Sequence, residues 1–296
     1  MDSRLNAFLE RADAVLARLE PLLPAPREVV DWNRSLAARW VREGRSGYLM
    51  PLEVSLDMRL SDLIGVDLQR EQLGRNTRQF IDGLPANHAL LWGSRGTGKS
   101  SLIRALLAEY AQAGLRLIEI ERDHLGDLPR VVEQLQKLPQ RFVLFCDDLS
   151  FEAGESDYRV LKSVLDGSLE QAPDNVLLYA TSNRRHLVPE KESDNANWKH
   201  VDGELHPSEA VEDKIALSDR FGLWLSFYPF TQEHYLNVVE HWITQLALAA
   251  GLSWQRDAEL DKLAIRWATG RGNRNGRCAY QFARYWVGLK LLEQQP

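Results

Sequence analysis

Gly93-Ser94-Arg95-Gly96-Thr97-Gly98-Lys99-Ser100 is the most informative stretch of this chain. It stands directly after the apolar run 89–92 and directly before a helix-like run that begins at Ser101. The spacing G-x-x-x-x-G-K-S between a strand and a helix is typical of a phosphate-binding loop, or P-loop. Its glycines let backbone N–H groups close around phosphates, and the helix start adds its positive dipole end. We therefore expect residues 93–101 to bind a nucleotide, with Lys99 at the β- and γ-phosphates and Ser100 on magnesium.

The chain changes its pattern on both sides of this loop. Residues 5–19 carry apolar side chains at helical spacing, and after several prolines a second helix-like run covers about 27–43. Short apolar runs then alternate with longer amphipathic stretches. These runs are 89–93, 115–120, 142–146, 175–180 and 223–227. The alternation predicts parallel strands with crossover helices, the doubly wound α/β class. After Thr231 only helix-like runs remain, and the last begins near Asn275.

The sequence therefore predicts three parts. They are a helical N-terminal extension (1–58), an α/β nucleotide-binding core (59–230) and an α-helical lid (231–296). The extension contains Trp32 and Trp40, which would suit a partner surface because tryptophan is common at binding hot spots. We favour packing against the core, because helices that bury one face use the same residues.

Polar residues follow two consecutive strands of the predicted sheet. Asp147 is the expected magnesium ligand, and Asp148 the expected acid that polarises the attacking water. Glu152 is the alternative to Asp148, because it stands only four residues further on. Asn183 closes the polar segment after the run 175–180, where a short amide can orient the water beside the γ-phosphate.

Three arginines are candidates for contact with phosphate. Arg220 ends a helix-like segment just before the last apolar run, and a guanidinium there can stabilise the charge that develops on the γ-phosphoryl oxygens. Supplied by a neighbouring subunit, it would make activity depend on assembly. A glycine-rich turn places Arg277 in the first turn of the last helix, where the helix dipole opposes a cation. A phosphate partner explains Arg277 better than local stability does, and Arg274 is the weaker candidate for this contact.

Composition places this chain of 296 residues among ordinary globular proteins, with 44% hydrophobic and 26% charged residues. No run reaches the ~18 apolar residues of a membrane span, and the acidic start does not resemble a signal peptide, so we expect a cytoplasmic protein. The formal net charge of −6 disfavours nucleic acid as a partner. Residues 190–213, with eight acids and two lysines, account for this charge, and we interpret them as a solvated insertion rather than a docking site. Neither Cys146 nor Cys278 has metal-ligand spacing around it.

The order of these motifs resembles that of an AAA+ ATPase. The resemblance implies Walker A and Walker B elements, sensor 1 at Asn183, an arginine finger at Arg220 and sensor 2 at Arg277. It also implies adenine contacts from Ile64 and Gly65, in the segment LSDLIGVD.

Longer phrases point to a narrower family. FCDDLSFE, YATSNRRHLVP and LSDRFGLWLSFYP are similar to those of a bacterial family of ATP-binding proteins known only as a domain of unknown function, number 815. The resemblance covers about 52–290. Tyr280 departs from the AAA+ pattern, because we expect a basic residue at that position of the lid helix.

The resemblance implies ATP and Mg²⁺ as cofactors and a homo-oligomeric assembly. We expect hydrolysis of ATP to ADP and phosphate, coupled to remodelling or release of an unknown partner protein. The alternative is an ATP-gated loader or switch, in which slow hydrolysis acts as a timer. A DNA initiator is disfavoured, because 231–296 carries eight bases against six acids and ends with the lid helix. A GTPase would need N-K-x-D, where this chain has Asn183-Arg-Arg-His, and a small-molecule kinase would not need both Arg220 and Arg277.

Overall fold

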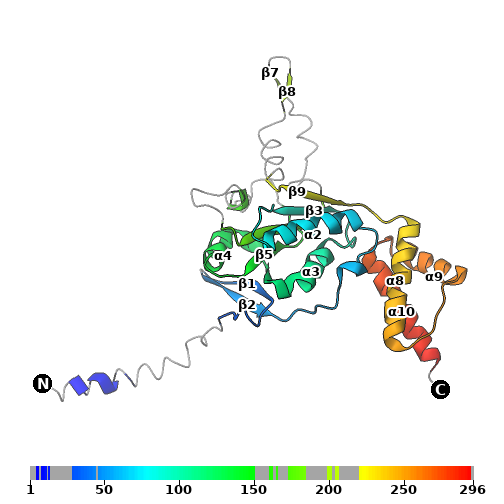
Figure 1. Ribbon diagram of the computed structural model, residues 1–296, viewed down its shortest axis with the longest axis horizontal. Helices are drawn as coiled ribbons and strands as arrows, with labels where there is room; N and C mark the ends of the chain where they lie inside the picture. The colour runs from blue at the N-terminus through cyan, green and yellow to red at the C-terminus, as the bar shows by residue number, and fades with distance from the viewer. Residues whose placement is uncertain are drawn as a thin grey trace.

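The structure, a computed structural model, describes residues 29–44, 46–150, 173–184 and 220–294 together with shorter pieces. The shorter pieces are residues 5, 6, 8–11, 13, 160–162, 165, 199–201 and 204–206. Within these ranges, none of the helices is long and apolar enough to cross a membrane. Figure 1 shows an α/β core and, beside it, a group of C-terminal helices.

A seven-stranded sheet forms the centre of the core. Its strands, in spatial order, are β2 (Ser46–Leu52), β1 (Ala37–Glu43), β4 (Leu115–Glu119), β5 (Arg141–Cys146), β6 (Val176–Ser182), β3 (Ala89–Gly93) and β9 (Leu223–Phe227). All neighbours pair in parallel except β1 with β2. The strands expected from the apolar runs are confirmed, and with them the α/β class. A separate antiparallel pair consists of β7 (Lys199–Val201) and β8 (Glu204–His206).

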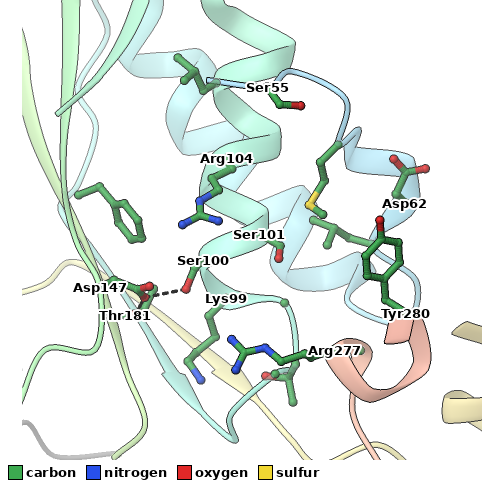
Figure 2. A pocket seen from close by; sticks show the side chains of 18 of the residues that line it. Ser55, Asp62, Lys99, Ser100, Ser101, Arg104, Asp147, Thr181, Arg277 and Tyr280 are labelled. Carbon is green, nitrogen blue, oxygen red and sulfur yellow. Dashed lines mark hydrogen bonds between the residues drawn. The ribbon is translucent and has the colours of Figure 1, made fainter. Parts of the chain in front are cut away.

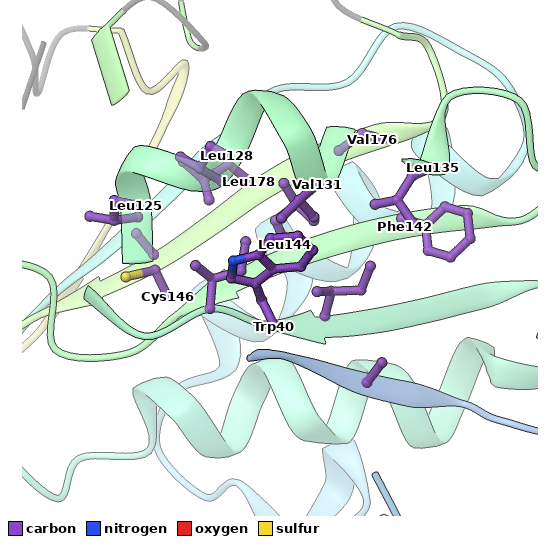
Figure 3. Close-up of a cluster of buried hydrophobic side chains, with 14 of the residues drawn as sticks. Trp40, Leu125, Leu128, Val131, Leu135, Phe142, Leu144, Cys146, Val176 and Leu178 are labelled. Atoms are coloured by element: carbon purple, nitrogen blue, oxygen red, sulfur yellow. The ribbon is translucent and has the colours of Figure 1, made fainter. Parts of the chain in front are cut away.

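Helices cover both faces of the sheet, which explains why its inner strands are mostly apolar. One face packs against α2 (Asp67–Ile81) and α3 (Lys99–Tyr110), and α3 continues into the short η3 (Ala111–Ala113). The other face packs against η4 (Arg122–Asp127) and α4 (Leu128–Leu135). Side chains of β5 alternate between the two: Val143 and Phe145 contact the first layer, and Phe142 and Leu144 the second. Figure 3 shows the second layer, with Leu128 and Val131 of α4 above Leu144.

Three helices form the C-terminal lid and bury a hydrophobic core of their own. They are α8 (Gln232–Ala250), α9 (Ala258–Gly270) and α10 (Gly276–Glu293). Each begins at a polar residue that accepts a hydrogen bond from the first turn, as helix starts require: Thr231, Asp257 and Asn275. The expected helical lid, with its last helix beginning near Asn275, is confirmed.

The N-terminal region differs from the expectation. Residues 5, 6, 8–11 and 13 are helical, as predicted, but the helix expected over 27–43 is wrong, because β1 and β2 form an antiparallel hairpin there. β1 also pairs in parallel with β4, so the hairpin extends the central sheet. The apolar positions 36, 37, 40 and 41 fit helical spacing, and this misled the prediction. The contacts with β4 decide the structure, as tertiary packing often overrides local pattern. The division into three parts stays a proposal.

Trp40 explains why the hairpin docks where it does. Its side chain is 1% exposed, and its indole N–H donates to the buried Asp127 carboxylate at 3.1 Å. Gly47, on β2, makes room for the indole, because a Cβ there would lie 2.1 Å from Cζ2 of Trp40. Trp32 is also buried and packs edge-on against Phe142 with ring centroids 4.9 Å apart. Packing of both tryptophans against the core is therefore confirmed.

Candidate functional site

The P-loop joins the end of β3 to the start of α3. Its backbone needs glycine at two crowded positions. Gly93 has φ 131°, and a Cβ there would lie 2.0 Å from the carbonyl oxygen of Phe227 on β9. Gly96 has φ 76°, and a Cβ there would meet the side chain of Asn275 at 2.6 Å. The loop is thereby held between the sheet and the lid, with α3 beginning at Lys99.

Lys99 lies at the centre of the loop and is 6% exposed. Its ammonium donates to the carbonyls of Gly93 and Ser94 at 2.7 and 2.8 Å, and to Oδ1 of Asn183 at 3.1 Å. Burial lowers the pKa of Lys99 to about 8, although the charges of Asp147 and Asp148 partly offset this. An ammonium whose hydrogen-bond acceptors are all neutral oxygens is suited to receive an anion.

A set of hard oxygen atoms stands beside Lys99. Oδ1 of Asp147 accepts hydrogen bonds from Ser100 Oγ at 2.6 Å and from Thr181 Oγ1 at 2.5 Å. Mg²⁺ prefers such ligands and usually takes one or two from the protein and the rest from water and phosphate. The Ser100 hydroxyl and the Asp147 carboxylate therefore fit a magnesium ion, and Thr181 holds the carboxylate toward it. No sequence motif pointed to Thr181, because its role depends on β5 and β6 being neighbours.

Asp148 follows in a strained conformation. Among the described non-glycine residues, Asp148 is the one whose φ is positive, at 55°. Its backbone N–H donates to Thr181 Oγ1 at 3.0 Å, and its Oδ1 accepts from Nδ2 of Asn183. Asn183 thus bridges Lys99 and Asp148, which places the expected water-orienting amide between the phosphate-binding cation and the expected acid. The other carboxylate oxygen of Asp148 lies 3.6 Å from Nη2 of Arg95.

The lid contacts the P-loop directly. The backbone N–H of Gly276 donates to the carbonyl of Gly96 at 2.8 Å, and Nδ2 of Asn275 donates to the carbonyl of Arg95 at 3.1 Å. Asn275 also begins α10, so one residue positions both the helix and the loop. A helix start near Asn275 was predicted from the sequence, whereas the contact of Asn275 with a loop 180 residues away was not.

The segment expected to contact adenine is also joined to the lid. His234, on α8, stacks on Phe230 and lies with Nε2 2.8 Å from the carbonyl oxygen of Ile64. Gly65 has φ 74°, and a Cβ there would lie 2.1 Å from that imidazole. Ile64 packs against the lid core. Nothing in the sequence pattern pointed to His234.

These elements surround a cavity of about 1110 Å³. Of the residues expected in the site, it is lined by P-loop residues 95–101, Ile64, Asp147, Asp148, Asn183 and Arg277. Figure 2 shows Arg277 reaching from the first turn of α10 toward Lys99, with Tyr280 one turn further along. The structure thus brings together most of the residues that the sequence singled out.

Three charged candidates do not join this group. Arg220 precedes β9, whose first residue pairs with Ala89 at the start of β3. It therefore lies at the amino-terminal end of these strands, whereas the P-loop follows their carboxyl-terminal end. Arg274 is exposed and is not among the cavity's described lining residues. Glu152 lies outside the described residues, as does most of the acidic segment 190–213.

Comparison with known proteins identifies a family and a fold. Residues 33–290 match the family described as "Protein of unknown function (DUF815)". No protein with a curated description matches the chain.

Solved structures share the fold at low sequence identity. The Thermotoga maritima RuvB Holliday junction branch migration motor is 16% identical, with a TM-score of 0.50 over 77% of this chain and 63% of that one. The Aeropyrum pernix Orc1 protein in complex with DNA is 15% identical, with a TM-score of 0.53 over 80% and 65%. Domain III of the T. maritima replication initiation protein DnaA is 12% identical, with a TM-score of 0.51 over 83% and 94%.

The chain therefore spans a little under two thirds of the RuvB and Orc1 chains. At these identities the likeness shows the fold alone: an AAA+ P-loop core followed by a helical lid.

Proposed function

We propose that this chain, which belongs to the family described as "Protein of unknown function (DUF815)", is a magnesium-dependent ATPase that works in a homo-oligomer. One observation carries the proposal: the hydrogen-bonded series that joins Lys99 to Asn183, Asn183 to Asp148, and Asp147 to Ser100. It sets a cation for phosphate, an oxygen site for magnesium and a second acid, Asp148, side by side at the carboxyl end of the parallel strands. Such an arrangement serves phosphoryl transfer by positioning and electrostatics.

Each residue then has a defined task. The P-loop amides and Lys99 hold the β- and γ-phosphates, and Arg277 approaches them from the lid. Ser100 and Asp147 hold Mg²⁺, which neutralises charge on the phosphate oxygens when bound. Asp148 accepts a proton from a water whose oxygen bonds to the γ-phosphorus, while the bond from that phosphorus to the bridging oxygen of ADP breaks. ADP and inorganic phosphate are the products.

The position of Arg220 supports a shared site. It lies at the opposite end of the strands from its own P-loop, so it is unable to reach that loop's γ-phosphate. A head-to-tail assembly would bring it to the P-loop of the next subunit. We propose that Arg220 is supplied in this way, and that hydrolysis therefore requires assembly.

The contacts between lid and P-loop support coupling to a partner protein. Asn275 and Gly276 bind loop carbonyls, and His234 binds the segment at Ile64. A nucleotide that fills the cavity between them would move the lid relative to the core. We propose that this movement remodels or releases a partner. The second candidate function is an ATP-gated loader or switch that uses the same movement with slow hydrolysis.

Steady-state ATP hydrolysis as a function of protein concentration tests the proposal. The comparison uses the wild type, Asp148→Ala, Arg220→Ala and the control Asp82→Ala, which removes an exposed carboxylate at the end of α2. We expect turnover per subunit to rise with concentration and to fall by at least about 100-fold in Asp148→Ala and about 1000-fold in Arg220→Ala. Asp82→Ala should keep wild-type turnover. Tight ATP binding without turnover would reject the ATPase and favour the switch.

A further inference from the structure

Arg95, the third residue of the P-loop, carries a charge that the functions assigned so far do not use. Its side chain is 77% exposed and lines the cavity, with Nη2 3.6 Å from Oδ2 of Asp148. Because Asn183 binds the other oxygen of the same carboxylate, both oxygens of Asp148 are engaged. The expected water-activating acid is therefore partly neutralised by a cation from its own phosphate loop.

The backbone around Arg95 is held by hydrogen bonds, whereas its side chain is largely exposed. Its carbonyl accepts from Asn275, and the neighbouring Gly96 carbonyl accepts from Gly276. The pair with Asp148 is long and solvent-exposed on both sides, with Asp148 58% exposed, and such pairs are weak. A guanidinium on a fixed loop with a weak partner turns readily to a stronger one. A phosphate bearing two or more negative charges, held by the same loop, is such a partner.

We propose that Arg95 is a second arginine of the catalytic site, supplied by the same subunit, which pairs with Asp148 in the free protein and with the γ-phosphate when ATP is bound. This inference rests on the proposed ATPase function. On binding ATP, the guanidinium leaves Asp148 free to accept the proton of the attacking water. It also stabilises the charge on the γ-phosphoryl oxygens as their phosphorus leaves the bridging oxygen of ADP. ADP has no γ-phosphate, so with ADP bound Arg95 returns to Asp148.

Three other cations set this role apart. Arg277 approaches the phosphates from the lid and not from the loop. Lys99 lies in the loop beneath the phosphates and is buried, so it serves ATP and ADP alike. Arg220 lies at the far end of the strands and serves only an assembled oligomer. Of these four cations, Arg95 is the one paired with Asp148, and we place it on the γ-phosphate side for that reason. It therefore distinguishes ATP from ADP in a single subunit, independently of protein concentration.

Binding measured by isothermal titration calorimetry tests the proposal without relying on activity. The probes are ADP and the non-hydrolysable analogue adenylyl imidodiphosphate, both with magnesium, and the variants are Arg95→Ala and Arg95→Lys. We expect Arg95→Ala to lose about tenfold or more in affinity for the analogue and less than about twofold for ADP. Arg95→Lys should fall between, because an ammonium keeps the charge but not the planar fork. These differences should be equal at low and high protein concentration.

Arg75→Ala is the matched control. Arg75 is also an exposed arginine in a surface ion pair, with Glu71 at 2.6 Å, but it lies on α2 away from the cavity's described lining. It should bind both probes as the wild type does. In the Arg220→Ala background, Arg95→Ala should lower the residual hydrolysis further, by about tenfold or more.

Several results would overturn the inference. Equal losses for the analogue and for ADP would make Arg95 a general support of the loop, and unchanged affinities would leave it a surface residue. Faster hydrolysis in Arg95→Ala would show that Arg95 only inhibits Asp148. If the wild type binds neither probe, the proposed ATPase function itself fails, and this outcome is distinct from the other three.

Discussion

At the scale of single residues, Lys99 links nucleotide binding to pH. Burial lowers its pKa to about 8 in the free protein, and bound phosphates would raise the pKa again. The free protein loses this proton as pH rises through 8, so affinity is fully present below pH 8 and is lost above it. We expect the affinity for adenylyl imidodiphosphate to fall by up to about tenfold between pH 8 and pH 9.

Calorimetry in buffers of different ionisation enthalpy should show net proton uptake on binding near pH 8. Lys99→Arg supplies the control, since a guanidinium stays charged over this range. If Lys99→Arg still binds the analogue, its affinity should be flat where that of the wild type falls. An equal slope in both proteins would assign the pH dependence to another group.

His88 has a measurable effect on stability. Its Nδ1 accepts from the backbone N–H of Leu178 at 2.9 Å, and burial lowers its pKa to about 4. The unfolded chain takes up this proton below about pH 6.5, earlier than the folded chain does, so acid favours unfolding. The stability due to neutral His88 is present above pH 6.5 and is lost as pH falls toward 4. We expect a loss of about 2 kcal/mol at pH 5 relative to pH 7 from this group alone.

Urea unfolding at the two pH values measures this loss. His88→Asn keeps an acceptor near the Leu178 amide but does not titrate, so it should show a smaller loss by about that amount. The same pH dependence in His88→Asn would show that other groups cause it.

At the scale of secondary-structure elements, the β1–β2 hairpin gives a matched pair of glycine substitutions. Gly47→Ala places a Cβ against the buried Trp40 indole, and we expect it to destabilise the protein by about 1–3 kcal/mol. Gly74→Ala, in the middle of α2, meets no atom within 4 Å and should stabilise by about 0.5–1 kcal/mol. Urea denaturation of both variants checks the signs. A neutral Gly47→Ala would mean that Trp40 moves aside without cost.

The elements also show how much of the structure can be predicted from the sequence. The strands around the P-loop were predictable, because a strand buried on both faces must be apolar throughout, and the carboxyl ends of parallel neighbours meet at one edge. That logic places Asp147 and Asn183 near Lys99. The hairpin was not predictable, because the spacing of its apolar positions also fits a helix. Only the pairing of β1 with β4 favours a strand. The contacts of Asn275, His234 and Thr181 join distant segments, and no local pattern encodes such pairings.

At the scale of the whole molecule, a site shared between subunits predicts complementation. An Arg220→Ala subunit has a complete pocket but gives its neighbour no arginine, whereas an Asp148→Ala subunit gives the arginine but lacks the acid. Mixed in equal amounts, the two inactive variants should recover about a quarter of wild-type turnover, if subunits assemble head to tail at random. Hydrolysis measured across mixing ratios should peak at the equal mixture. A mixture as inactive as its parts would place Arg220 outside the neighbouring site.

The place of β1 in the sheet has a consequence for how the chain is made. β1 is the first of the sheet's strands to be synthesised, yet its parallel neighbour β4 follows roughly 80 residues later. At about 5–20 residues per second on the ribosome, that interval lasts about 4–16 s. Throughout it, Trp40 and its strand have neither β4 beside them nor α4 above them. During translation the nascent hairpin thus exposes unpaired backbone groups and apolar side chains. Chaperones that bind such segments have several seconds in which to bind it.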